Sequence, residues 1–339
     1  MNPEFVEDAW AGLVCLPVIA VLLVAGIATG HTGGALVAAS GAISVGFGSF
    51  QRFTRNKAAP MLLAALGMAS SAVCGSLLGE IWPVLVVAAA VWGGVCGWAL
   101  TFGMGLWWIA LQWAIALFVA GAYPSGPLGA LVRASLVLAG GALQFLVVVL
   151  VWKLQRLEPA GHALRVRTYL RYGRRQLHGS LGLIGYAMRA AAAAALCVTL
   201  SRSLKMPNGY WAPMTALLVL RPTLRETLSR GLARGVGTLV GAGVATLVAA
   251  WLRPGEYLTA ALVVLFAWGA YAARRVHYAA LTTSVTACIV FLLALFGLPE
   301  LPNAVHRIFA TLVGGAIALT LAGLTGSIAL VRRERCVSR

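Results

Sequence analysis

The chain has 339 residues, of which 60% are hydrophobic and 10% are charged, whereas about a quarter of the residues of soluble globular proteins carry charge. It holds 26 Lys and Arg against 9 Asp and Glu, for a formal net charge of +17. These basic residues cluster in short segments between apolar runs, as topology signals do, which argues against a nucleic-acid-binding protein. Apolar runs of spanning length recur from end to end, so the composition predicts an all-α, polytopic transmembrane protein without a separate extramembrane domain.

The first six-span repeat is expected at residues 1–153. Its predicted spans lie near residues 10–29, 33–50, 59–79, 83–101, 104–123 and 130–152. The N-terminal sequence MNPEFVEDAW is acidic and lacks the basic segment of a cleaved signal peptide. The first apolar run is therefore expected to remain in the protein as a span.

A basic linker is expected at residues 154–180, and a second six-span repeat follows at residues 181–339. The spans predicted in this second half lie near residues 181–203, 210–221, 231–252, 257–273, 278–297 and 305–331. The total is about twelve spans.

The two halves share a spacing pattern near their last spans. Arg133 precedes Gly140 and Gly141 by the same seven residues by which Arg307 precedes Gly314 and Gly315. Because each half has an even number of predicted spans, two such repeats would have the same orientation in the membrane. The sequence thus predicts two parallel six-helix repeats in one chain, a covalent pseudo-dimer.

The distribution of basic residues predicts which side of the membrane holds the termini. If the N-terminus is cytoplasmic, five of the 26 Lys and Arg residues fall outside: Arg133, Arg202, Lys205, Arg253 and Arg307. The remaining ones fall on the cytoplasmic side, which is the asymmetry of the positive-inside rule. We therefore expect a multi-pass protein of the cell (plasma or inner) membrane with both termini in the cytoplasm.

The segment from Tyr210 to Arg221 is too short for an ordinary span, since helix from Trp211 to Arg221 would cover only about 15 Å. Its counterpart in the first half, residues 31–53, is rich in glycine. Interrupted segments at matching positions of two repeats point to the binding site of a transporter. With Pro213 and Pro222 near its ends, the segment is expected to be a broken helix beside a water-filled cavity. The alternative is one kinked helix over residues 212–229, with aromatic residues of the membrane interface at its start.

Residues 209–242 read GYWAPMTALLVLRPTLRETLSRGLARGVGTLVGA. This stretch resembles the signature of the fusaric acid resistance family of integral membrane transporters, which includes the aromatic acid exporters. The resemblance implies a membrane transporter that exports organic, often aromatic, acids. Two features depart from the family pattern: the first half lacks the Tyr-Trp-Ala-Pro and Arg-Pro elements, and only about 27 residues join the halves, where many members have a large cytoplasmic region. The six-span unit also distantly resembles that of plant malate channels, which form dimers, and this leaves a homo-oligomer open.

The distribution of charges favours an anionic substrate. The one Asp is Asp8, and the Glu residues lie at the termini or in predicted loops, so no carboxylate is expected in mid-membrane, where exporters of cations usually need one. A cell interior at negative potential expels anions with about 2.3 kcal/mol per charge per 100 mV. Arginines near the membrane faces and hydroxyl and amide donors within the spans would receive such a substrate. The candidate substrate-binding residues are Tyr210, Trp211, Pro213, Arg221, Arg225, Arg133, Arg307, Gln112, Thr282 and Thr286.

These residues also have ordinary structural interpretations. Thr and Gln side chains commonly form hydrogen bonds between transmembrane helices, and tryptophans commonly face lipid. Arginines near helix ends extend to the lipid headgroups at little cost. The sequence leaves both interpretations open for each of the ten residues.

Motifs for nucleotide binding, metal binding and catalysis are missing from the sequence, and the cysteines show neither metal-ligand spacing nor a disulfide pattern. We therefore expect no enzymatic activity, no cofactor and no metal. The expected function is a secondary transporter or channel that exports small organic anions, above all aromatic carboxylic acids, with membrane lipids around it. The alternative is a non-transporting scaffold or assembly protein of the cell envelope.

Overall fold

The computed structural model describes residues 3–51, 57–155 and 181–337. The expected linker lies outside the described residues from residue 156 onward. Within the described residues the helices are α1 (Pro3–Leu13), α2 (Leu16–Ala28), α3 (Thr32–Gly48), α4 (Ala58–Leu78), α5 (Trp82–Ala99), the short 3-10 helix η1 (Leu100–Phe102), α6 (Met104–Ala122), α7 (Pro127–Leu154), α9 (Leu181–Ser203), α10 (Trp211–Val219), α11 (Leu224–Leu252), α12 (Glu256–Ala272), α13 (Tyr278–Ala294) and α14 (Glu300–Val337).

These helices have the lengths that a membrane requires. Among the described residues, eight helical segments are long and apolar enough to cross a bilayer, and α1 and α2 together count as one of them. Three further apolar helices, α3, α12 and α13, are shorter, and α10 has only nine residues. The expectation of an all-α, multi-pass membrane protein is confirmed.

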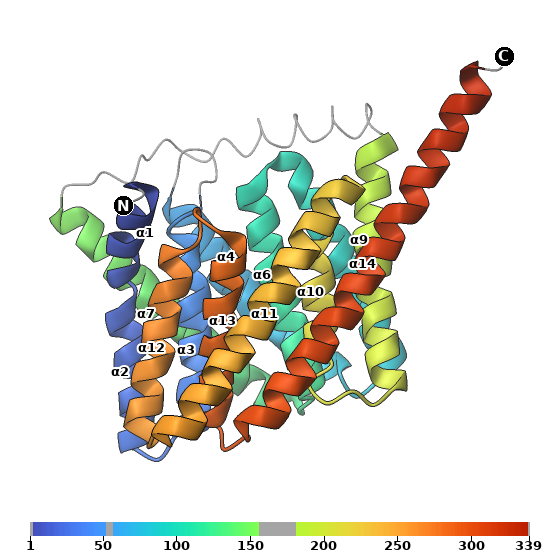
Figure 1. Cartoon of the computed structure of the whole chain (residues 1–339). Coiled ribbons are helices and arrows are strands. Elements are labelled where there is room, and N and C mark those ends of the chain that lie inside the picture. Colours follow the sequence, from blue (N-terminus) through green and yellow to red (C-terminus); the bar gives the residue numbers. More distant parts are fainter. Residues whose placement is uncertain (1–2, 52–56, 156–180, 338–339) are drawn as a thin grey trace.

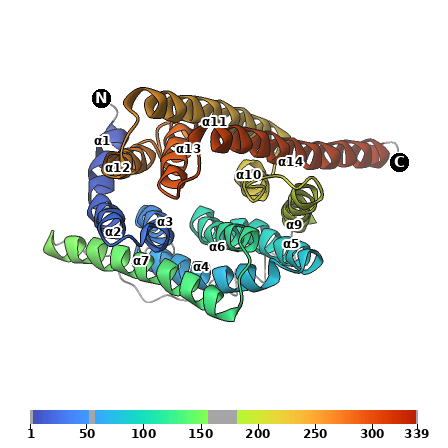
Figure 2. The same ribbon diagram turned by 90° about the horizontal axis from the view of Figure 1, so that it is seen from below.

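The two halves of the chain lie side by side. Seen from below, helices α2 to α7 form one side of the molecule and α9 to α14 form the other (Figure 2). At one end of this arrangement α5 packs on α9, and at the other end α12 packs on α1 and α2. Helices α3, α6, α10 and α13 face the middle, where α6 contacts α10 (Figure 2). Helix α10 is thus held at the boundary between the halves.

Two apolar cores join the halves, and each contains side chains from both. One core includes Leu117 of α6, Tyr186 of α9 and Leu217 of α10. The other includes Ile19 of α2 and Phe291 of α13. Because each core removes apolar surface of both halves from the surroundings, the halves are held as one body.

Glycines allow the closest helix contacts. A Cβ atom on Gly140 of α7 would overlap the carbonyl oxygen of Ala38 in α3. A Cβ atom on Gly314 of α14 would overlap the carbonyl oxygen of Ala212 in α10 in the same way. Small residues at such positions let transmembrane helices approach closely, and here they bring α14 against α10.

An ionic cluster ties the N-terminal helix to the second half. The buried carboxylate of Asp8 in α1 pairs with Arg274 at 3.0 Å and with Arg275 at 2.7 Å, both in the α12–α13 connection. Hydrogen bonds from Arg275 to Asp8, and then to Glu7, raise the pKa of Arg275 above its ordinary value. Helix α1 begins and α14 ends at this same end of the molecule (Figure 1), which we call the terminal end. The one Asp of the chain is therefore already paired at this end.

Candidate functional site

Helix α10 is a short helix that stops within the body of the protein. It begins at Trp211 and ends at Val219, and α11 begins at Leu224. Pro213 lies in the first turn, where backbone N–H groups have no partner within the helix, so it starts the helix rather than interrupting it. The backbone leaves helical geometry at Leu220, whose ψ is 128°. The prediction of a broken helix is confirmed, and a continuous kinked helix is not what forms.

Two threonines hold the break between α10 and α11. The hydroxyl of Thr227 accepts a hydrogen bond from the backbone N–H of Arg221 at 3.0 Å and donates to the carbonyl of Thr223 at 2.8 Å. The Thr223 side chain caps α11 by accepting from the backbone N–H of Glu226 at 3.3 Å. A Thr-x-x-Glu sequence is a capping box, and this signal of a new helix start is visible at Thr223 in the sequence.

Two side chains of helix α9 donate hydrogen bonds to carbonyl groups at the break between α10 and α11. The hydroxyl of Tyr186 donates to the carbonyl of Leu220 at 3.0 Å. A terminal nitrogen of Arg189 donates to the carbonyl of Pro222 at 3.3 Å. Backbone groups freed at a helix end must find partners when water is excluded. The break between α10 and α11 is thus stabilised by specific hydrogen bonds.

Arg221 lies buried at the end of α10 nearer the terminal end. It is 6% exposed, and its guanidinium lies over the ring of Trp107 of α6, 4.3 Å from the ring centroid. None of the described residues accepts a hydrogen bond from its two terminal nitrogens, which are both buried. Its guanidinium therefore lies against a ring face and pairs with no carboxylate among the described residues.

Arg307 lies at the other end of α10. It is 2% exposed, and its Nε donates to the hydroxyl of Thr286 in α13 at 3.3 Å. Its guanidinium lies 5.1 Å from the centroid of the Trp211 ring at the start of α10. The structure thus brings together three residues predicted for the site, from three different helices.

A third buried arginine, Arg234 of α11, was not among the predicted site residues. It is 7% exposed, and its Nε has no hydrogen-bond partner among the described residues. Its positive charge interacts with that of Arg307. One turn later on the same helix face, the buried hydroxyl of Thr238 likewise has no partner in the described part of the chain. The spacing of Arg234 and Thr238 within an apolar helix was the signal available in the sequence.

The three buried arginines form no ion pair with an acidic side chain among the described residues. Arginine does not lose its proton in proteins, and an isolated buried ion costs several kcal/mol even after relaxation. Arg221, Arg234 and Arg307 therefore form a buried cationic region whose charge is not neutralised by the described residues.

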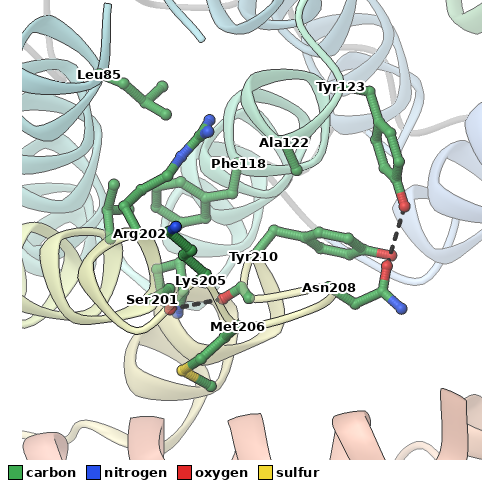
Figure 3. Close-up of a pocket in the computed structure, with 13 residues that line it drawn as sticks. Leu85, Phe118, Ala122, Tyr123, Ser201, Arg202, Lys205, Met206, Asn208 and Tyr210 are labelled. Carbon is green, nitrogen blue, oxygen red and sulfur yellow. Dashed lines mark hydrogen bonds between the residues drawn. The ribbon is translucent and has the colours of Figure 1, made fainter. Parts of the chain in front are cut away.

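Other predicted residues lie near this region. Tyr210 and Pro213 line a pocket at the end of the molecule opposite the terminal end (Figure 1), and Figure 3 shows Tyr210 in this pocket. The ring of Tyr210 lies 5.3 Å from that of Trp211, measured between centroids. Gln112 is buried in α6, and the hydroxyl of Thr282 donates to the carbonyl of Ala279 at 2.9 Å within its own helix.

Two predicted arginines lie apart from the buried cationic region. Arg225 is exposed on the first turn of α11. Arg133 of α7 is half-buried and donates to the hydroxyl of Ser76 and, at 3.3 Å, to the carbonyl of Ala120. The partners of Arg133 all lie in the first half of the chain, whereas those of Arg307 lie in the second.

The apolar helices define a multi-pass membrane protein, and a helix that stops within such a protein is a feature typical of transporters. Residues 194–321 match the family model described as fusaric acid resistance protein-like. The match confirms the resemblance over this part of the chain, which contains α10 and the three buried arginines. No curated protein and no solved structure matches the chain.

Proposed function

We propose that the protein is a secondary transporter or channel that exports small organic anions, with aromatic carboxylic acids as its main substrates. The observation that carries this proposal is the set of three buried arginines around α10, none of which has an acidic partner among the described residues. The family match over residues 194–321 supports it. We propose no enzymatic activity.

The energetics favour an anion at this position. An unpaired buried guanidinium costs several kcal/mol, and a carboxylate beside it would recover much of this cost through charge-assisted hydrogen bonds. The ring faces of Trp107 and Trp211, next to Arg221 and Arg307, add apolar surface for a substrate ring. Since a negative interior expels anions with about 2.3 kcal/mol per charge per 100 mV, export needs no buried carboxylate to carry protons.

We also propose that the halves are parallel six-helix repeats with the substrate path between them. The contact of α3 with α7 has its counterpart in that of α10 with α14, and the contact of α4 with α6 in that of α11 with α13. Between the halves, α5 packs on α9 as α12 packs on α2. In this arrangement both termini lie in the cytoplasm, at the cell membrane, and the substrate passes along α10 between Arg307 and Arg221.

The test is anion flux in proteoliposomes that contain the purified protein under an imposed membrane potential. We expect a flux of aromatic carboxylate that reverses with the sign of the potential. Arg221→Gln and Arg307→Gln should each reduce it about tenfold or more, because a hydrogen bond to a charged group contributes about 1.5–3 kcal/mol. The matched control is Lys153→Gln, which removes an exposed cation at the end of α7 and should leave the flux unchanged. No flux of any aromatic or dicarboxylic acid at either polarity would refute the proposal.

A further inference from the structure

A pocket of about 320 Å³ (Figure 3) opens at the boundary of the two halves. It lies beside the α9–α10 connection, at the end of the molecule opposite the terminal end (Figure 1). This volume is at the lower end of the range of small-molecule sites. Its lining comes from α5 and α6 of the first half and from α9, the α9–α10 connection and α10 of the second. The lining residues are Leu85, Phe118, Ala122, Tyr123, Val198, Ser201, Arg202, Lys205, Met206, Asn208, Gly209, Tyr210 and Pro213.

The charge of this pocket is positive. Arg202 and Lys205 line it, and none of its described lining residues is acidic. One terminal nitrogen of Arg202 donates to the carbonyls of Gly79 and Gly121, at 3.1 and 2.6 Å. These two bonds fix the guanidinium, and its other nitrogens, which form no hydrogen bond with the described residues, remain donors for a ligand.

The pocket also has aromatic walls. The rings of Phe118, Tyr123 and Tyr210 line it (Figure 3), and the last two lie 6.0 Å apart between centroids. The hydroxyl of Tyr123 is held by the side chain of Asn208 at 3.0 Å. Rings next to cations suit a ligand with a flat apolar body and one anionic group.

The pocket adjoins the buried cationic region through consecutive residues. Tyr210 lines the pocket and interacts electrostatically with Arg307, and the ring of the next residue, Trp211, lies against the same guanidinium. A ligand in the pocket is therefore one aromatic side chain away from Arg307.

We infer that this pocket is a binding site for an aromatic monocarboxylate, in which Arg202 and Lys205 hold the carboxylate and Phe118, Tyr123 and Tyr210 contact the ring. This inference rests on the proposed transport of anions and adds the place where the substrate binds at the end of its path opposite the terminal end. It requires that both the charge and the ring of the ligand contribute to binding.

Two cations of the chain offer a matched pair of substitutions. Lys205 lines the pocket, whereas Arg253 ends α11 away from it. Both are exposed, and both have positive φ, 48° and 41°. Asparagine tolerates this left-handed conformation, so Lys205→Asn and Arg253→Asn each remove one positive charge without adding backbone strain.

The measurement is binding of benzoate to the full-length detergent-purified protein, by titration calorimetry, with benzamide and acetate as comparison ligands. We expect benzoate to bind at least fivefold more tightly than benzamide, which lacks the charge, and than acetate, which lacks the ring. Lys205→Asn should weaken benzoate binding about three- to fivefold, in line with an ion pair near the surface, and Arg253→Asn should not change it.

Equal effects of the two substitutions, or equal binding of benzoate and benzamide, would overturn the pocket assignment. Either result would leave the proposed function intact if carboxylate flux persists in proteoliposomes. Conversely, benzoate binding that depends on Lys205 in a protein without flux would refute transport and retain the pocket. Loss of benzoate binding on addition of anionic phospholipid at micromolar amounts, with the same dependence on Lys205, would assign the pocket to a lipid headgroup and overturn the inference.

Discussion

Replacing Arg307 with methionine is expected to stabilise the protein while it abolishes anion transport. Methionine matches much of the length and apolar volume of the arginine side chain, but it carries no charge. If the guanidinium of Arg307 is a buried cation that stays unpaired until a substrate anion binds, its removal should raise the free energy of unfolding of the substrate-free protein. If it is a structural hydrogen-bond donor, its removal should be destabilising.

The structure allows the two sides of this balance to be compared. Removing the guanidinium loses one hydrogen bond to Thr286, which contributes about 1.5–3 kcal/mol because the donor is charged. It also loses the contact with the Trp211 ring, which contributes up to about 2 kcal/mol when desolvated. Against these stands the several kcal/mol of burying an unpaired ion, together with repulsion from Arg234. We expect the free energy of unfolding to rise by about 1–3 kcal/mol, within the range found when buried ions are replaced by apolar residues.

The assay is the midpoint of thermal unfolding of the detergent-purified protein, followed by the reaction of its buried cysteines with a fluorogenic thiol reagent. The matched control is Arg133→Met, because the half-buried guanidinium of Arg133 already donates to Ser76 and to Ala120. That variant should unfold at a lower temperature than the wild type. If Arg307→Met lowers the midpoint as much as Arg133→Met does, Arg307 is an ordinary structural arginine and the reasoning from an unpaired buried charge is refuted.

Two further substitutions test the fold around α10, each by the same unfolding assay. Thr227→Val removes the hydroxyl that bridges the backbone at the α10–α11 break and should lower the free energy of unfolding by about 1–3 kcal/mol, whereas Thr320→Val, at an exposed position of α14, should change it by less than about 0.5 kcal/mol. Gly314→Ala should cost about 1–3 kcal/mol because its Cβ would overlap the carbonyl oxygen of Ala212, and Gly315→Ala, which meets nothing within 4 Å, should gain about 0.5–1 kcal/mol. Equal effects within either pair would contradict the packing described for that position.

Much of the helical framework could be predicted from the sequence because bilayer thickness fixes the length of an apolar run. The run near residues 130–152, for example, corresponds to α7, which begins at Pro127. The first run was a harder case, since residues 10–29 were expected as one span. The structure has a separate α1 that ends at Leu13 before α2 begins at Leu16. Pro17 was the available signal, because proline favours the first turn of a helix and disfavours a helical residue before it.

The site was less accessible to sequence reasoning because it depends on helix rotation and packing. Arg221 and Arg225 are four residues apart, yet one is buried beside Trp107 and the other is exposed, because the break at Pro222 places them on separate backbone segments. In the sequence, Arg234 is one of the many basic residues that indicate the cytoplasmic side of the membrane, so nothing marks it as a site residue. Only the packing of α11 against α14 places it near Arg307.

Arg133 and Arg307 occupy the same position relative to the following glycine pair in each half, but their surroundings differ. Arg133 is half-buried and already donates to two acceptors within the protein, so an anion beside it would relieve less of the cost of an unpaired buried charge. Among the described residues, Arg307 has one hydrogen-bond acceptor, a ring face and a like-charged neighbour, so an anion beside it would form bonds that the substrate-free protein lacks. Under the proposed repeat and the proposed transport, the first half is a structural scaffold and the second half binds the anion. The family match over residues 194–321 falls on this second half.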